Sequence, residues 1–357
     1  MNPKVTFIVP CYKLAHLLPE CINSILSQTY DDFEVLIMDD ASPDNTPEVA
    51  ASFNDPRVKH IRNNPNLGHL KNYNHGIGLS RGEYVWLISA DDRLRSPQVL
   101  ERYVKLMDRH PKMGYVFCRG VGLENGKETG ILKWGDCGEG DRVWSGRKFL
   151  VELLETNKVI AASGMVRMRC YKNITVFPLD LPYAGDWYLW CIFAFHCDVG
   201  YLAEPMVSYR LHELSMTNTL TRRHRIEDNL AVRWRMKGLA QQAGDVVLEQ
   251  QCLESIARHY TFCATSHAFQ TSEYALTPAE WAESLENNTR DETTRCFIRA
   301  RIFVGIGNGY YRRSDALQAT RYYRLALEQD GSMFKVRVKN ALARMGGFGL
   351  LVSRMFV

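Results

Sequence analysis

Residues 1–110 alternate between short β-rich runs and segments that suit helices, and this alternation constrains the fold more than any other feature. Four runs are expected to be strands: Val5–Val9, Phe33–Met38, Val58–Ile61 and Tyr84–Ser89. Four segments between and after them are expected to be helices: Leu14–Ser27, Thr46–Phe53, Leu70–Ser80 and Gln98–Arg109. The pairs Thr46-Pro47 and Ser96-Pro97 are typical of helix starts. Such alternation predicts right-handed βαβ units and a mostly parallel, helix-covered sheet, which is an α/β fold.

The pattern loosens between residues 113 and 212. Seven glycines between 120 and 140 indicate hairpins and loops. Helices are expected to start near Ser145 and Asp186, and Asp198–Arg210 is expected to form one or two strands.

Strand signals nearly vanish beyond Thr221. Residues 222–345 are expected to form successive helices with breaks near Gly244, Thr277 and Gly331. Asp315–Glu328 resembles one helix of a helical-hairpin repeat, but no 34-residue period accompanies it. The 357 residues also exceed the ~250–300 at which one core stops growing. We therefore expect an α/β domain over 1–220 and a helical domain with a cationic tail over 221–357.

Apolar runs and cysteines indicate the compartment. No basic segment followed by a long apolar stretch begins the chain, so no signal peptide is expected. The longest strongly apolar stretch, Trp187–Phe195, has nine residues, about half of a membrane span. The ten cysteines are scattered without any Cys-x-x-Cys, which argues against a zinc site and favours reduced thiols in the cytoplasm.

The net charge of +4 is concentrated in the tail. Residues 331–357 contain five basic residues and no acid, so the other 330 residues sum to −1. Alternating apolar and basic residues there would suit peripheral contact with an anionic membrane at the inner face of the cell membrane, and packing on the helical domain is the equal alternative. The basic run 222–225 is short and lies on a neutral body, so no nucleic-acid partner is expected.

Acidic side chains follow two of the predicted strands. Asp39-Asp40 comes after the second strand and Asp91-Asp92 after the fourth, while the first strand ends at Pro10-Cys11-Tyr12-Lys13. Ligands of open α/β sheets bind at these carboxyl ends. The first strand end lacks Gly-x-Gly-x-x-Gly, and no Gly-x-x-x-x-Gly-Lys-Ser/Thr exists, so dinucleotide and P-loop chemistry are disfavoured. Acidic side chains at strand ends, without a glycine-rich phosphate-binding loop, instead indicate a site where a cation bridges the acids and a bound diphosphate.

Seven blocks in order make a family resemblance plain. They are Val-Pro-Cys-Tyr-Lys (9–13), Met-Asp-Asp-Ala-Ser-Pro-Asp-Asn-Thr (38–46), Asn-Leu-Gly (66–68), Arg-Gly-Glu-Tyr-Val (81–85), Ser-Ala-Asp-Asp (89–92), Gly-Asp-Trp (185–187) and Tyr-Arg-Leu-His (209–212). Across residues 4–217 the chain resembles glycosyltransferase family two, of the GT-A fold. The resemblance implies an inverting, metal-dependent transferase that moves a sugar from a nucleotide diphosphate sugar, most simply a UDP-sugar, to an acceptor hydroxyl. It also suggests bacterial surface-polysaccharide assembly, with a glycan or lipid-linked glycan as acceptor.

The same resemblance implies roles for individual residues. Pro10 and Tyr12 would bind the nucleotide, with Tyr12 stacked on the base and Asp40 accepting the uracil imide N–H. Asp91 would bind ribose. Asp92 would bridge to Mn²⁺ or Mg²⁺, with His212 completing the metal or diphosphate site. Asp186 would deprotonate the acceptor hydroxyl.

Two departures concern the donor site. Lys13 stands where the family usually has Asn, and Tyr73-Asn74 where it usually has Arg-Asn. Lys13 or Lys71 would have to replace the missing cation, and we expect Lys71 to contact the donor.

Ordinary structural roles compete with these assignments. Asp186 would be a helix cap with a lowered pKa, Tyr12 a core residue, and His212 a surface residue. A sugar-nucleotide nucleotidyltransferase, or an inactive binding module with this fold, is the alternative function. The former normally carries a glycine-rich basic motif after its first strand, which is absent here.

Overall fold

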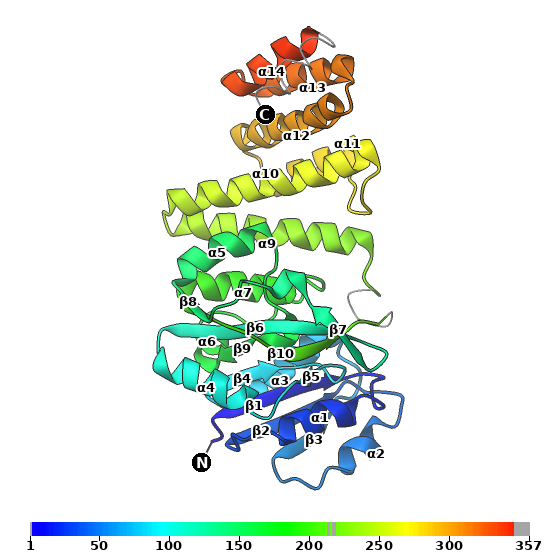
Figure 1. The fold of residues 1–357 in the computed structure, drawn as a ribbon, viewed down its shortest axis with the longest axis vertical. Helices are drawn as coiled ribbons and strands as arrows, with labels where there is room; N and C mark the ends of the chain where they lie inside the picture. The colour runs from blue at the N-terminus through cyan, green and yellow to red at the C-terminus, as the bar shows by residue number, and fades with distance from the viewer. Residues whose placement is uncertain (1, 213–214, 216–218, 346–357) are drawn as a thin grey trace. The chain divides into compact units, whose positions relative to one another are not determined.

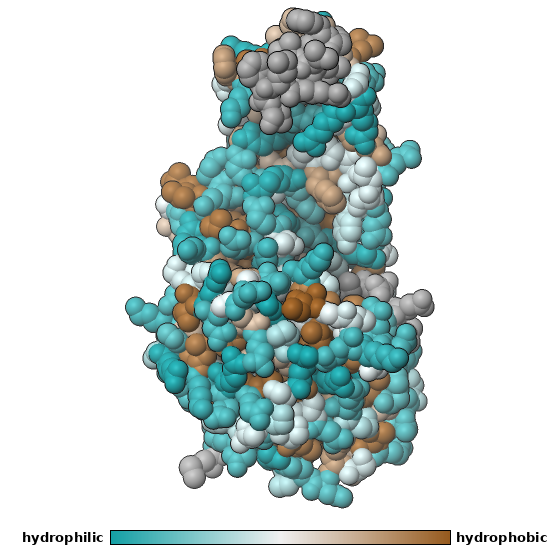
Figure 2. Space-filling view, in the orientation of Figure 1, coloured by the Kyte–Doolittle hydropathy of each residue, from teal (hydrophilic) through white to brown (hydrophobic). Residues whose placement is uncertain are grey.

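The computed structural model describes residues 2–212, 215 and 219–345, and the chain forms two compact units, Met1–Thr221 and Arg222–Val357 (Figure 1). On the face shown in Figure 2, apolar residues are scattered among hydrophilic ones. Among the described residues, no helix combines the length and apolar character needed to cross a bilayer.

The first unit is built on one ten-stranded sheet with the order β3-β2-β1-β4-β9-β6-β10-β5, to which β7 adds beside β6 and β8 beside β10. The strands are β1 Val5–Cys11, β2 Phe33–Asp39, β3 Val58–Arg62, β4 Tyr84–Leu87, β5 Arg93–Leu94, β6 Met113–Glu124, β7 Lys127–Ile131, β8 Arg142–Trp144, β9 Met165–Arg167 and β10 Asp198–Arg210. Strands β1 to β4 are parallel, and β9 is antiparallel to both β4 and β6. The expected parallel α/β sheet is confirmed, with an antiparallel strand in its middle.

Helices cover both faces of the parallel part (Figure 1). They are α1 Leu18–Leu26, α2 Thr46–Ala51, α3 His69–Leu79, α4 Val99–Arg109, α5 Gly146–Glu155, α6 Met168–Asn173 and α7 Gly185–His196. Residues Phe7 and Val9 of β1 share a core with α1 and α4. On the opposite face Ile8 meets α3, where a Cβ on Gly76 would lie 2.7 Å from the Ile8 side chain. Burial on both faces explains why these strands are continuous apolar runs.

The helix starts differ from the expected caps. Neither Thr46 nor Ser96 caps a helix through its side chain. Thr46 is instead the first residue of α2, and its backbone N–H and hydroxyl both donate to Asp44, at 3.2 and 2.6 Å. Helix α4 begins at Val99, after Ser96-Pro97. The cap predictions are wrong because other groups accept the terminal N–H groups: Asp44 accepts that of Thr46, and the Gln28 side chain accepts that of Leu100 at 2.9 Å.

The second unit is helical, as expected. Its helices are α9 Arg222–Gln242, α10 Val246–Phe269, α11 Pro278–Asn288, α12 Glu292–Arg312, α13 Ala316–Gln329 and α14 Phe334–Arg344. Apolar residues of α9, α10, α11 and α12 share one core, and α13 and α14 form a smaller one. Arginines at the start of α9 pair with acids within the unit, as in Arg225 with Glu273 at 3.0 Å.

The first two helices of this unit recur 70 residues later in the chain. Helices α9 and α12 both have 21 residues and start at 222 and 292, and α10 and α13 start at 246 and 316. Gly244 and Ser314, also 70 apart, both have positive φ, of 66° and 63°. The next residue, Asp245 or Asp315, donates its N–H to the carbonyl five residues earlier, and its side chain caps the following helix. The pair α9–α10 therefore recurs as α12–α13, whereas α11 and α14 start at 278 and 334 and do not share this spacing.

The cationic tail lies partly outside the described residues, because the structure is described only up to Met345. Within it, α14 packs on α13 through Val336 and Ala343, which are buried. One face of α14 therefore packs on the helical unit, which was the alternative to membrane contact for this part of the tail.

Candidate active site

The acid pairs lie on either side of the end of β1. The backbone N–H of Asp40 donates to the Cys11 carbonyl at 3.1 Å, and that of Ala90 donates to the Pro10 carbonyl at 3.2 Å. Because β2 and β4 both pair with β1 in parallel, their carboxyl ends meet at the same sheet edge. Asp40 and Asp91 therefore both lie at the carboxyl end of β1, on opposite sides of that strand.

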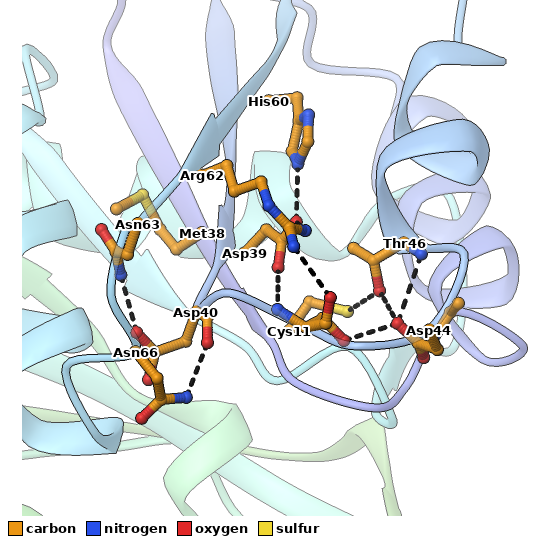
Figure 3. Close-up of polar contacts among 12 residues, drawn as sticks. Cys11, Met38, Asp39, Asp40, Asp44, Thr46, His60, Arg62, Asn63 and Asn66 are labelled. Atoms are coloured by element: carbon orange, nitrogen blue, oxygen red, sulfur yellow. Dashed lines mark hydrogen bonds and ion pairs between the residues drawn. The ribbon is translucent and has the colours of Figure 1, made fainter.

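Asp39 stabilises the turn that follows β2. Its carboxylate is fully buried and contacts Arg62 Nη1 at 2.5 Å and His60 Nε2 at 3.1 Å. It also accepts the Ser42 N–H at 2.8 Å. Figure 3 shows Asp39 facing His60 and Arg62, while Asp40 points toward Asn63 and Asn66. The first acid of the pair is therefore a structural residue.

Asp40 organises the loop before α3. One carboxylate oxygen accepts the Leu67 N–H at 2.8 Å and the Asn63 amide at 2.9 Å, and the other accepts the Gly68 N–H at 2.9 Å. Its side chain is buried, and its backbone carbonyl accepts the Asn66 amide. The block Asn66-Leu67-Gly68 is thus attached to Asp40. The predicted contact of Asp40 with a uracil ring stays a prediction.

Asp91 and Asp92 are held by the end of β10. Arg210 donates its backbone N–H to the Asp92 carboxylate at 2.9 Å and its Nε to the Asp91 carbonyl at 2.8 Å. Its guanidinium also reaches Glu20 at 2.5 Å. The Nε2 of His212 lies 2.9 Å from Asp91 Oδ2. The predicted site residues Asp91, Asp92 and His212 are therefore neighbours.

This acid pair fits a cation. The second oxygen of Asp91, Oδ1, is buried with no hydrogen-bond partner. Burial and the adjacent Asp91 charge raise the pKa of Asp92 well above its usual range. A divalent cation bound here would give Asp91 Oδ1 a partner and would favour the ionised form of Asp92. The described residues include no cluster of three His, Cys, Asp or Glu side chains placed to hold a metal, so substrate oxygens and water would have to supply the remaining ligands.

The first strand end offers an aromatic surface. Tyr12 is 44% exposed, so the core alternative is wrong for this residue. Lys13 has a positive φ of 60°, and its Nζ lies 5.1 Å from the centre of the Tyr12 ring. Pro10 is buried beneath this surface, and Lys71 is exposed on α3. These positions leave Tyr12 and both lysines accessible to a ligand.

Asp186 lies in the first turn of α7. Its oxygens accept the Trp187 N–H at 2.6 Å and the Asn157 amide at 3.2 Å. Burial raises the pKa of Asp186 to about 6, although these donors and the nearby Trp190 ring N–H lower it. The lowered pKa expected from the helix terminus is therefore wrong, because removal from water outweighs the helix dipole. A carboxyl with a pKa near neutrality suits a general base.

Tyr73 connects the parts of the site. Burial raises the pKa of Tyr73 above its usual value, and the charges of Asp91, Asp186 and Asp92 add to the effect. All three carboxylates therefore lie near enough to Tyr73 for their charges to disfavour its ionised form. Tyr73 occupies the position where the sequence lacked an expected arginine, and its ring packs against His69 and Phe177.

Sequence reasoning missed three supporting residues: Glu20, Asn157 and Arg210. Arg210 lies within the block Tyr-Arg-Leu-His (209–212), so the sequence could have indicated it. Glu20 on α1 and Asn157 after α5 carried no sequence signal, since their partners are distant in the chain.

Comparisons with known proteins agree with this geometry. The family model for glycosyl transferase family 2 matches residues 6–174. A curated relative, an uncharacterized glycosyltransferase of Rickettsia typhi, is 27% identical over 220 residues, which cover 61% of this chain and 67% of the relative.

Two solved structures share the fold. TarS of S. aureus, crystallised with UDP-GlcNAc, has a TM-score of 0.62 and 18% identity, covering 96% of this chain and 92% of that one. A mannosyltransferase from Pyrobaculum calidifontis, in complex with GDP-Man and Mn²⁺, has a TM-score of 0.50 and 17% identity, covering 85% and 86%. The first unit therefore has the GT-A fold, and its residues 6–174 belong to glycosyltransferase family 2.

Proposed function

We propose that the protein is an inverting, metal-dependent glycosyltransferase that moves a sugar from a nucleotide diphosphate sugar, a UDP-sugar, to an acceptor hydroxyl. The observation that carries this proposal is the acid pair Asp91-Asp92 held by Arg210 and His212, with Asp91 Oδ1 buried and left without a partner. Two structural neighbours, one with UDP-GlcNAc and one with GDP-Man and Mn²⁺, support the donor class.

The donor would lie across the end of β1. Tyr12 would stack on the base above Pro10, and Lys71 would approach the diphosphate from α3. Asp40 would accept the uracil imide N–H in addition to the backbone groups that it already binds. Asp91 would bind the ribose. This arrangement uses the exposed aromatic face of Tyr12 and the nearby cations.

Asp92 and His212 would hold the divalent cation, Mn²⁺ or Mg²⁺, beside Asp91. When bound, such a cation neutralises charge on a departing nucleoside diphosphate. Arg210 would keep the two carboxylates in place through its bonds to both residues.

Asp186 would act as the general base. With a pKa of about 6, it is mostly ionised at pH 7 and can accept the acceptor hydroxyl proton as that oxygen attacks the anomeric carbon. Attack opposite the leaving group inverts the configuration there. Asn157 and the Trp187 N–H hold the carboxylate in position.

We further propose that the domain over 1–220 performs this reaction in bacterial surface-polysaccharide assembly. The acceptor would be a glycan or a lipid-linked glycan. The protein would work in the cytoplasm, and its cationic segment 331–357 would contact the inner face of the cell membrane.

A thermal-shift panel tests the donor and the cation together. UDP, GDP and their sugar conjugates are each added with and without Mn²⁺. A ligand at about 100 times its dissociation constant stabilises the folded state by ~2.7 kcal/mol. We expect uridine ligands to raise the melting temperature only with Mn²⁺. No stabilisation by any nucleotide contradicts the proposal, and stabilisation without release of UDP from any UDP-sugar in the presence of acceptors indicates an inactive binding module.

A further inference from the structure

Helix α14 carries a second apolar face that no described residue uses for packing. Its buried face consists of Val336, Asn340 and Ala343, which contact the rest of the helical unit. Phe334, Val338 and Met345 are instead 73%, 43% and 52% exposed. At about 100° per residue, positions 334, 338, 341 and 345 lie within about 60° of one another and opposite the buried face. The four positions form a narrow stripe, called here the α14 stripe.

Cations flank the α14 stripe on both sides. Lys335 and Lys339 lie along one edge, and Arg337 and Arg344 along the other. Residues 331–345 contain no acid. Lys339 bonds to Asn308 at 2.9 Å, and Arg337 bonds to the Gly331 carbonyl.

Several basic side chains elsewhere in the unit pair with carboxylates, as Arg301 does with Glu254 at 2.7 Å and Lys237 with Glu249 at 3.3 Å. In the described part of the chain, no carboxylate lies within ion-pair distance of a basic residue of α14. Burial, Arg312 and Lys335 all lower the pKa of Lys339, which indicates a concentrated positive charge. This surface therefore attracts anions.

We propose that the α14 stripe docks on an anionic lipid surface, with Phe334, Val338 and Met345 entering the headgroup region and the four cations contacting lipid phosphates. An apolar stripe bordered by cations on both sides is the pattern of a helix that lies in the plane of a membrane interface. The apolar run Phe348–Val352 follows directly in the sequence. This docking specifies the membrane contact proposed above for residues 331–357, and it does not depend on the transfer reaction.

Flotation with liposomes tests this surface on the full chain. Vesicles of phosphatidylcholine are compared with vesicles that also contain phosphatidylglycerol. We expect flotation only with the anionic vesicles and a decrease at high salt, since each basic residue near such a surface adds about a five-fold increase in binding.

The decisive variant is Phe334→Ser with Val338→Ser, which leaves every charge in place. We expect at least a ten-fold loss of vesicle binding. Leu317→Ser is the matched control, because Leu317 is 79% exposed on α13 outside the stripe, and it should bind as wild type. Melting temperatures of all variants should be equal, since these side chains are exposed.

Any of three flotation results overturns the proposal: no flotation of the wild type on anionic vesicles, equal flotation of the double variant, or an equal loss in the Leu317 control. A dimer in light scattering that the double variant abolishes also overturns it, in favour of self-association. Release of UDP from a donor in solution should be unchanged in the double variant. Failure of the docking is thus distinguished from failure of the transferase proposal.

Discussion

Replacement of Asp186 by Asn should stabilise the protein and inactivate it at the same time. Burial raises the pKa of this carboxyl from its ordinary 3.8 to about 6. The folded state therefore favours the protonated form, and its stability falls as the pH rises from below 3.8 through 6. The difference of 2.2, at about 1.4 kcal/mol per pKa unit, gives an upper bound of about 3 kcal/mol at pH 7. Partial exposure of the side chain and its two donors reduce this gain.

The same change removes the proposed base. General bases contribute about 10²–10⁴-fold to rate, which corresponds to roughly 3–5 kcal/mol of barrier. We therefore expect Asp186→Asn to lose that factor in turnover while binding UDP and Mn²⁺ as wild type does. In the wild type, turnover should rise with pH up to about pH 6 and then level off, because only the ionised carboxylate accepts a proton.

The assay combines thermal melting at pH 4 and pH 7 with measurement of UDP release. At pH 4 the two proteins should melt at nearly the same temperature, and at pH 7 the variant should melt higher. Asp31→Asn is the control, since Asp31 is an exposed acid at the other end of the sheet. Near wild-type turnover in Asp186→Asn refutes the base assignment. Equal melting temperatures at pH 7 refute the argument from burial.

Four other changes test separate parts of the structure. Asp92→Asn should abolish Mn²⁺-dependent UDP binding in calorimetry, and retained binding contradicts the cation site. Tyr12→Ala should weaken UDP binding about 5- to 150-fold, because stacking of a base on an aromatic ring is worth about 1–3 kcal/mol, whereas Tyr12→Phe should bind normally. Ser314→Gly should raise stability in urea unfolding by up to about 1 kcal/mol, since φ of 63° favours glycine. Cys170 Sγ lies 3.9 Å from Cys197, and its hydrogen bond lowers the pKa of Cys197, so Cys170→Ala should slow alkylation of Cys197 at pH 7 as followed by mass spectrometry.

The central parallel strands β1, β2 and β4 could be predicted because they are buried on both faces and form nearly continuous apolar runs. Once β1, β2 and β4 are placed in parallel, the convergence of Asp40 and Asp91 follows from topology alone. The supports of these acids could not be predicted in this way. Glu20 and Arg210 are 190 positions apart, and no local pattern links them.

Local rules failed where tertiary contacts dominate. The helix terminus predicted a low pKa for Asp186, but burial among residues from other elements reversed it. The expected cap at Thr46 was replaced by Asp44, whose position depends on the fold of the preceding turn. The recurrence of α9–α10 as α12–α13 was not found from the sequence, although Asp245 and Asp315 mark the same turn in both pairs.

The bonds from Leu67 and Gly68 to Asp40 have a consequence for the timing of ligand binding. Because these bonds hold the loop in the absence of any ligand, a nucleotide bound beside Asp40 as proposed would not have to immobilise it. The amide protons of Leu67 and Gly68 should then exchange slowly with solvent both with and without UDP. Under that proposal, neither association nor dissociation would require this segment to open.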